Sequence, residues 1–391
     1  MRTPPAVSAD PAALRVGRFR WVICALLFAA TALNYVDRQI IGILQPTLAQ
    51  QFHWSEIDYG NIVFWFEVAY AVGYLIFGKL IDRIGARAGY ALAVGIWTVA
   101  HVAHAWASSL TDFIVARFAI GLGESGNFPA SLKAVAEWFP KRERALATGI
   151  VNAGTNIGAI VTPLIVPVIT LTLGWRAAFL ITGSFTVVWL VVWLAVYRPP
   201  RQHPRLGAAE LALIESDPPD PTVSISWRRL LRLRETWAYA IGKFLIDPVW
   251  WMWLFWLPDF LVKRHHLDLK TFGPPIAAVY VISDIGSIAG GWMSSRLLHA
   301  GFSLNAARKY TMLLCAVLVL PVLGVANVDD LWGAVAIVGL AAAGLCTRYL
   351  LPRLLPVGAH DYGAGRIAVA LAGRFRPAMG TRDQACPPGV E

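Results

Sequence analysis

Charge is scarce in this sequence. Only 15% of the 391 residues are charged, 57% are hydrophobic, and the mean hydropathy is +0.55. A soluble domain carries roughly 25% charged residues, because water must solvate its surface. The composition therefore excludes an ordinary soluble globular protein and indicates a chain that lipid surrounds. The 17 tryptophans fit this reading, since indole rings favour membrane interfaces.

Cysteine is also scarce and has no useful spacing. The four cysteines, Cys24, Cys315, Cys346 and Cys386, lie far apart, and three of them are in or beside apolar runs. This pattern excludes a disulfide framework and a cysteine metal site. A cleavable leader is not expected either, because no small-residue cleavage site follows the apolar run after the basic stretch 15–20. The first apolar run is expected to remain as a membrane span.

Acidic residues are fewer than basic ones, and the net charge is +10. A nucleic-acid-binding protein gathers its basic residues on one accessible face. Here the basic residues form short clusters between apolar runs, which is a signal of membrane topology. We therefore expect a lipid bilayer as the environment and no nucleic acid as a partner.

Long apolar runs dominate what remains. A transmembrane helix needs about 20 mostly apolar residues. Runs of this kind predict spans near 21–44, 57–79, 88–107, 112–134, 146–170, 175–197, 237–262, 273–295, 308–327 and 331–347. The polar, proline-rich stretch 198–233 separates the first six from the rest. We expect an all-α membrane protein with two helical bundles.

Lysine and arginine alternate between connections, which predicts the orientation. The basic connections are the N-terminus, 79–87, 141–144, the linker 198–233 and the loop after 296; the loop 263–272 is an exception. We predict a cytoplasmic N-terminus (1–20), an N-terminal bundle (21–197), a cytoplasmic linker (198–233), an incomplete C-terminal bundle (234–346) and an atypical tail (347–391).

The connection after the second span resembles the signature loop of the major facilitator superfamily. It reads from Gly78 to Arg87 and contains Asp82, Arg83 and Gly85. Gly78 is expected to allow close helix approach, Asp82 to cap or to pair with basic groups, and the arginines to anchor the loop in the cytoplasm. An ordinary basic turn is the alternative. The resemblance implies two six-helix bundles related by a pseudo-two-fold axis, and a glycine-entered basic turn at 291–296 fits that repeat.

Within that superfamily the chain resembles the hexuronate transporters of the anion:cation symporter family. The stretches that carry the resemblance are 34–39, 117–130 and 243–251. The implied function is proton-coupled uptake of a sugar acid, such as galacturonate or glucuronate, by a monomer in a bacterial inner membrane. No enzymatic activity, metal or cofactor is expected, and the proton is the coupling ion.

Ionisable residues inside predicted spans are candidates for function, because a charge at the bilayer centre costs several kcal/mol. Arg38 suits a substrate carboxylate, since its guanidinium can donate two parallel hydrogen bonds. Asp37 and Glu124 suit proton coupling, because a dry cavity favours the uncharged acid. The resemblance assigns the same roles to these three residues and adds Tyr70 as a substrate contact. Glu67, at mid-helix, is either functional or structural.

Three further residues are weaker candidates. Asn156 lies in a polar stripe of the fifth span and offers a partner for sugar hydroxyls, and helix packing is the alternative. Trp251 either lines the sugar site or faces lipid. Arg117 lies seven residues before Glu124, two helical turns away on one face, so the two are expected to pair.

The sequence departs from the family after about residue 346. Arginine, proline and glycine recur to the end and leave no apolar run of 20 residues, so the last two family helices are expected to be missing. The alternatives to a hexuronate transporter are a transporter of a related anion such as an aldonate, and a truncated membrane protein that does not transport.

Overall fold

The computed structural model describes residues 17–217 and 231–345, and nearly all of them are helical. The α-helices are α1 (Phe19–Phe52), α2 (Glu56–Ala103), α3 (Leu110–Glu124), α4 (Asn127–Trp138), α5 (Lys141–Leu173), α6 (Trp175–Val196), α7 (Ala208–Ile214), α9 (Arg234–His265), α10 (Gly273–His299), α11 (Leu304–Val319) and α12 (Leu331–Leu345). Short 3₁₀ helices are η2 (His104–Trp106), η3 (Pro200–Gln202) and η4 (Leu320–Asn327). Among the described helices, seven are long and apolar enough to cross a membrane. The predicted tail, 347–391, lies outside the described residues.

Helix α2 contains two of the predicted spans. Gly85 breaks it with φ 82° and ψ 163°, a conformation that only glycine adopts without strain. Ser55 and Asp58 form a capping box that starts α2, and Ser109 with Asp112 starts α3 in the same way. The spans predicted on either side of the basic loop are therefore both present, with Gly85 as the turn between them.

The span predicted at 112–134 is not continuous. The helix is interrupted at Ser125 and Gly126, so α3 and α4 are separate helices. A Cβ atom on Gly126 would lie 2.6 Å from the Cβ of Ala93, so this turn is packed closely against α2. The break falls in the polar, glycine-containing stretch 123–127, a helix-breaking signal that the span prediction did not use.

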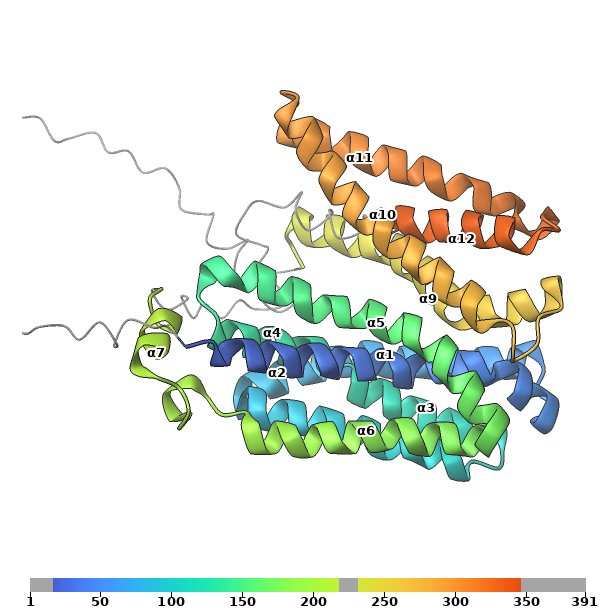
Figure 1. The fold of residues 1–391 in the computed structure, drawn as a ribbon, viewed down its shortest axis with the longest axis horizontal. Helices are drawn as coiled ribbons and strands as arrows, with labels where there is room; N and C mark the ends of the chain where they lie inside the picture. The colour runs from blue at the N-terminus through green and yellow to red at the C-terminus, as the bar shows by residue number, and fades with distance from the viewer. Residues whose placement is uncertain (1–16, 218–230, 346–391) are drawn as a thin grey trace, which may run out of the picture.

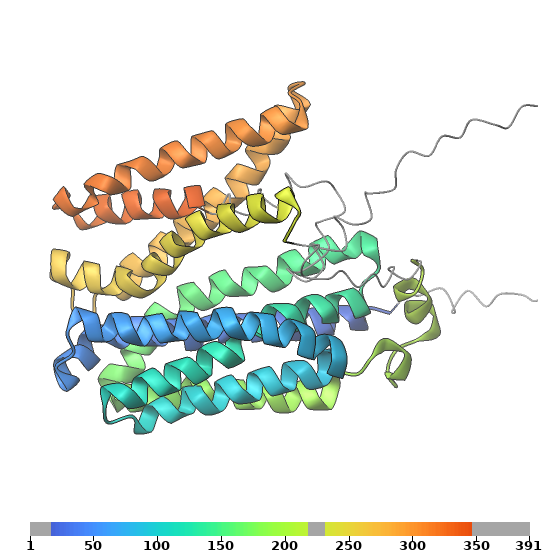
Figure 2. The ribbon, with the colours of Figure 1, turned by 180° about the vertical axis from the view of Figure 1, so that it is seen from behind.

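The helices fall into two groups (Figures 1 and 2). In the first group α1 packs against α5, α2 against α3 and α4, and α6 against α1 and α2. In the second group α10 packs against α12, and α12 against α11. The groups meet where α1 packs on α9 and α5 packs on α10. This is the two-bundle arrangement that the sequence predicted.

Hydrogen bonds join the two groups toward one end of the molecule. Gln39 Nε2 donates to Tyr280 Oη at 3.0 Å, and Tyr59 Oη donates to the carbonyl oxygen of Phe255 at 3.0 Å. At the opposite end, where α7 lies, α10 and α11 diverge from the first group in both views (Figures 1 and 2). The molecule is thus closed at the end that contains the α1–α2 turn.

The first part of the linker docks on the first group. Buried Glu210 of α7 accepts hydrogen bonds from the backbone N–H groups of Phe19 and Arg20, both at 3.1 Å. These are orphan donors of the first turn of α1, which favours a negative charge. Arg20 also pairs with Glu210 at 3.0 Å and Glu143 at 2.8 Å. The linker therefore supplies the cap that α1 lacks.

Candidate functional site

Arg38 and Glu124 form an ion pair at the centre of the first helix group. Arg38 Nε lies 2.7 Å from Glu124 Oε2, and the two side chains are 1% and 0% exposed. Arg38 also donates from Nη2 to Asn34 Oδ1, one turn earlier on α1, at 3.2 Å. A buried charge pair is stable only when both partners remain, because either charge alone would be uncompensated. An anion that binds Arg38 must therefore either displace Glu124 or share the guanidinium with it.

Aromatic rings surround the Arg38 guanidinium. Its Cζ atom lies 4.8 Å from the ring centroid of Tyr35, 5.6 Å from Phe66, 4.8 Å from Tyr70 and 4.7 Å from Trp251. These contacts stabilise a cation through the ring faces and exclude water from it. Trp251 belongs to α9, so both helix groups contribute to the site. The sequence-predicted residues Tyr70 and Trp251 are thus brought together around Arg38.

Arg117 does not form the ion pair predicted with Glu124. Its Nη2 donates instead to the carbonyl oxygen of Arg38 at 3.3 Å, and its Cζ lies 4.4 Å from the Phe66 ring centroid. Glu124 pairs instead with Arg38, which belongs to α1. In the described part of the chain, Arg117 Nε and Nη1 are buried without a hydrogen-bond partner. Spacing along one helix could not show this competition between helices.

Asp37 has neighbours different from those of Arg38. Its Oδ2 accepts a hydrogen bond from Thr186 Oγ1 at 3.0 Å, and its Oδ1 lies 3.3 Å from His101 Nε2. Consecutive residues of a helix point in directions about 100° apart, so Asp37 and Arg38 need not share a cavity. The Asp37 side chain contacts residues of α2 and α6, and its role in proton coupling with Glu124 stays a prediction.

Two histidines of this site were missed in the sequence. His101 and His104 are fully buried near the end of α2. Polar residues three apart in the otherwise apolar run 88–107 were a usable signal, since ionisable groups inside spans are expensive and usually functional. The aromatic rings around Arg38 were a weaker signal, because aromatic residues recur throughout the chain.

The remaining cavity candidates are placed less centrally. Asn156 is half-buried on α5, where its Oδ1 accepts from Thr155 Oγ1 at 3.1 Å. Glu67 is half-buried on α2, and its Oε1 is buried with no hydrogen-bond partner among the described residues. Glu67 is near enough to Arg38 and Arg117 to interact with both electrostatically. Glu67 thus lies at the edge of the Arg38 site, whereas Asn156 makes its hydrogen bond within α5.

The signature loop holds its end of the first group together. Lys133 of α4 donates to the carbonyl oxygen of Asp82 at 3.2 Å and lies 3.5 Å from its carboxylate. Arg87 donates to the carbonyl oxygen of Leu194 on α6. The role predicted for Gly78 is wrong, because a Cβ atom there would meet nothing within 4 Å. Arg83 is exposed, as expected for a residue that faces the aqueous side.

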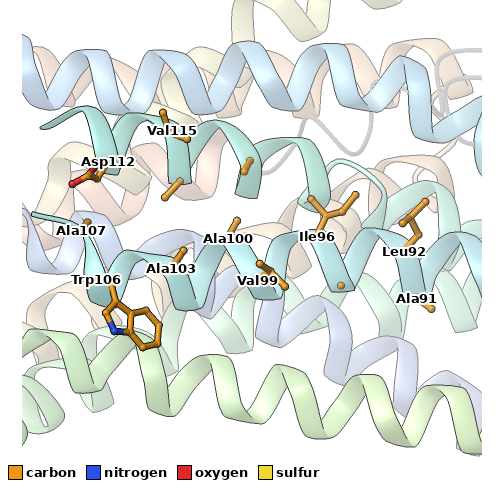
Figure 3. Close-up of a pocket in the computed structure, with 13 residues that line it drawn as sticks. Ala91, Leu92, Ile96, Val99, Ala100, Ala103, Trp106, Ala107, Asp112 and Val115 are labelled. Atoms are coloured by element: carbon orange, nitrogen blue, oxygen red, sulfur yellow. The ribbon is translucent and has the colours of Figure 1, made fainter. Parts of the chain in front are cut away.

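A groove lies elsewhere, between α2 and α3. Its volume is about 900 Å³, and alanine and branched aliphatic residues line most of it, from Ala91 to Ala119 (Figure 3). The one charged residue in the lining is Asp112, which would repel an anion. Val99 and Trp106 are 73% and 70% exposed, as expected for side chains that face lipid. The groove is therefore not the anion site.

Comparison with known proteins agrees with this geometry. The sequence profile of the Major Facilitator Superfamily matches residues 27–372. A galacturonate transporter of Dickeya chrysanthemi is 32% identical over 313 residues, which cover 78% of this chain and 90% of the relative. A hexuronate transporter of Escherichia coli (strain K12) is 31% identical over 363 residues, which cover 91% of this chain and 83% of the relative.

The fold also matches a solved structure. The inward-facing, unoccupied crystal structure of a bacterial homologue of the human lysosomal transporter Spinster superposes with a TM-score of 0.70. The identity is 17%, and the match covers 92% of this chain and 79% of that chain. At this identity the likeness shows the fold alone.

Proposed function

This chain belongs to the major facilitator superfamily, and we propose that it takes up a hexuronate or a similar sugar acid together with protons. It is a transporter of organic anions and not an enzyme. We place it in a bacterial inner membrane as a monomer, with the N-terminus and linker in the cytoplasm, because lysine and arginine gather in those connections.

The Arg38–Glu124 pair is the observation that carries this proposal. A hexuronate has one carboxylate, and a guanidinium binds a carboxylate through two parallel hydrogen bonds. In the structure one nitrogen of that guanidinium is held by Glu124 at 2.7 Å. A proton on Glu124 removes the negative charge that competes with the substrate. Proton binding and anion binding would then favour each other.

The aromatic rings around Arg38 suit a sugar. Tyr70 and Trp251 offer flat apolar faces to a pyranose ring, and the Tyr70 hydroxyl offers a hydrogen-bond partner. Because Trp251 comes from α9, a substrate bound in the site would contact both helix groups. An aldonate shares the carboxylate but is an open chain, and relatives that carry galactonate are 29% and 27% identical to this chain.

Counterflow in proteoliposomes tests the proposal. The full chain is reconstituted with unlabelled galacturonate inside and labelled galacturonate outside, and parallel vesicles contain galactonate or the neutral sugar galactose. We expect exchange of galacturonate, slower exchange of galactonate and none of galactose. Absence of exchange with both acids, by protein shown to be folded, would contradict transport. Faster exchange of galactonate would reassign the substrate to the aldonates.

A further inference from the structure

A row of polar side chains crosses the apolar interior of the first helix group. Asp37, His101 and His104 are each 0% exposed. His101 Nε2 is hydrogen-bonded with Thr182 Oγ1 at 2.7 Å and lies 3.3 Å from Asp37 Oδ1, which has no hydrogen-bond partner among the described residues. The ring centroids of His101 and His104 are 6.3 Å apart. Groups of this kind are costly in a membrane interior, so their alignment calls for an explanation.

Each imidazole on either side of the gap between the two rings has one ring nitrogen without a partner in the described part of the chain. His104 Nδ1 bonds to the carbonyl oxygen of Ala100 at 2.8 Å, which leaves Nε2 as the other polar atom of the ring. Among the described residues, His104 Nε2 and His101 Nδ1 are both buried without a hydrogen-bond partner. A buried water needs two or more such polar partners, and this pair supplies them.

The row leads to one end of the molecule and not to the Arg38 site. His104 belongs to η2, the last turn before the α2–α3 connection. At the inner end Asp37 Oδ2 is occupied by Thr186. His104 stacks on Phe179 with ring centroids 4.9 Å apart and lies 5.9 Å from the Phe113 ring.

Few charged groups act on this row. From α3, Glu124 acts electrostatically on Asp37, and Arg117 acts on His101. Helix α6 contributes only the hydroxyls of Thr182 and Thr186. Helix α5 carries its charged side chains only in its first turn, at 141–144. A proton on Asp37 would therefore weaken the electrostatic repulsion on Glu124, and through Glu124 it would affect the ion pair with Arg38.

We propose that His101 and His104 form a path that loads a proton onto Asp37 from the α2–α3 end of the molecule, separate from the substrate cavity. The inference rests on the proposed proton-coupled uptake. A hydronium ion that reaches the gap gives its proton to His101 Nδ1 and becomes water. His101 passes its Nε2 proton to Asp37 Oδ1, so the carboxylate becomes a neutral acid and the imidazole ends neutral. During uptake the proton on Asp37 leaves toward the cytoplasmic end and not back through the histidines, and His101 returns to its first tautomer by losing the Nδ1 proton and regaining one at Nε2.

His101→Gln tests the path. The glutamine amide can still donate toward Asp37 and Thr182, but it cannot accept a proton on one side while releasing one on the other. His104→Phe is a second variant, because a phenyl ring keeps the stacking on Phe179. His299→Gln is the control, since His299 bonds to the carbonyl oxygen of Ser295 as His104 bonds to that of Ala100, but is exposed.

Galacturonate counterflow and uptake driven by a pH gradient are measured in the same proteoliposomes. We expect both path variants to keep counterflow and to slow gradient-driven uptake by about tenfold or more, as for other positioned proton-transfer groups. The control variant is expected to match the parent. Unchanged gradient-driven uptake would overturn the path, and loss of counterflow as well would reduce the histidines to a structural role. Failure of the parent in counterflow would instead contradict the proposed function itself.

Discussion

Arg38 is held by two kinds of interaction that a lysine cannot both reproduce. The guanidinium is planar, so it stacks on rings such as Tyr70 and Trp251 while its edge pairs with Glu124. We predict that Arg38→Lys weakens galacturonate binding by about 2 kcal/mol, or roughly thirtyfold in Kd. Calorimetry on the purified full chain measures this.

Arg176→Lys is the matched control for that substitution. Arg176 also stacks on an indole, with its Cζ 4.3 Å from the Trp175 ring centroid, but it is exposed and far from Arg38 in the chain. Its replacement should leave binding unchanged. If Arg38→Lys binds galacturonate as tightly as the parent, Arg38 is not the carboxylate site.

Glu124 is expected to act through its charge. We predict that Glu124→Gln binds galacturonate at pH 8 as tightly as the parent does at acid pH, because glutamine does not compete for Arg38. The variant should exchange substrate but fail to accumulate it against a gradient. Counterflow and gradient-driven uptake in the same vesicles measure the two activities. Full accumulation by Glu124→Gln would show that this carboxylate is not a coupling site.

At the scale of residues, the sequence indicated which residues belong to the site more readily than which residues they contact. Arg38 and Glu124 could be selected because charged groups in spans are costly and usually functional, whereas Tyr70 came only from the family resemblance. That Glu124 pairs with Arg38 and not with Arg117 depends on how α1 and α3 pack. Asp37 was assigned to the cavity as an ionisable residue inside a span. Its contacts are with α2 and α6, because the direction in which a side chain points from a helix can be read only from the tertiary packing.

Packing between α1 and α5 depends on glycine at defined positions. A Cβ atom on Gly158 would lie 2.4 Å from the carbonyl oxygen of Ala32, which is backbone and cannot move aside cheaply. We predict that Gly158→Ala destabilises the first group by about 1–3 kcal/mol. Gly149→Ala is the control on the same helix, because nothing lies within 4 Å of its added Cβ. Alanine there should be neutral or stabilising by up to about 1 kcal/mol.

Thermal unfolding in detergent compares these two variants. Equal melting temperatures for Gly158→Ala and Gly149→Ala would show that α1 and α5 do not approach as closely as the structure describes. Helix packing was the alternative reading of the polar stripe around Asn156, and the structure shows a close approach to α1 at Gly154 and Gly158. Gly78 shows the limit of the same reasoning, because a glycine in a motif need not touch another helix.

The docked linker should respond to pH through His203. Burial lowers the pKa of His203 below its usual 6.5, and nearby Arg198 and Arg205 lower it further. Its ring lies 4.3 Å from that of Phe19 and 5.4 Å from that of Trp138, measured between centroids. The docked state prefers the neutral imidazole, so docking is favoured above pH 6.5 and weakens as the pH falls through that value.

Hydrogen exchange of the linker, corrected for the intrinsic effect of pH, measures this. We expect protection of residues 200–215 to fall between about pH 7 and pH 5 in the parent. In His203→Phe the phenyl ring keeps the stacking and cannot be protonated, so protection should not depend on pH. An equal loss in the parent and the variant would assign the effect to another group.

At the scale of the molecule, the sequence predicted two bundles and the boundaries of most spans. It could not predict their mutual arrangement, because apolar periodicity says which faces are buried but not against what. The described contacts close the molecule where α1 meets α2 and α9 meets α10. Lys263, which broke the charge pattern of the loops, is explained there, since it pairs across the groups with Glu56.

Alternating access requires this closed end to open during transport. We predict that a short bifunctional thiol reagent joins Glu56→Cys to Lys263→Cys and stops counterflow, and that a cleavable linker restores it on reduction. The pair is placed in a chain whose native cysteines are replaced by alanine. The exposed ion pair is worth little in water, so the substitutions themselves should cost about 1 kcal/mol or less.

Arg142→Cys with Arg296→Cys is the control pair, at the beginning of α5 and near the end of α10. These helix ends are well separated in both views, so the same short reagent should not join them in this state (Figures 1 and 2). A proton gradient with galacturonate should make that link form, because the groups must then approach at this end while the other end opens. Full counterflow with Glu56→Cys and Lys263→Cys joined would show that the groups need not separate there. The substrate would then have to enter by another route.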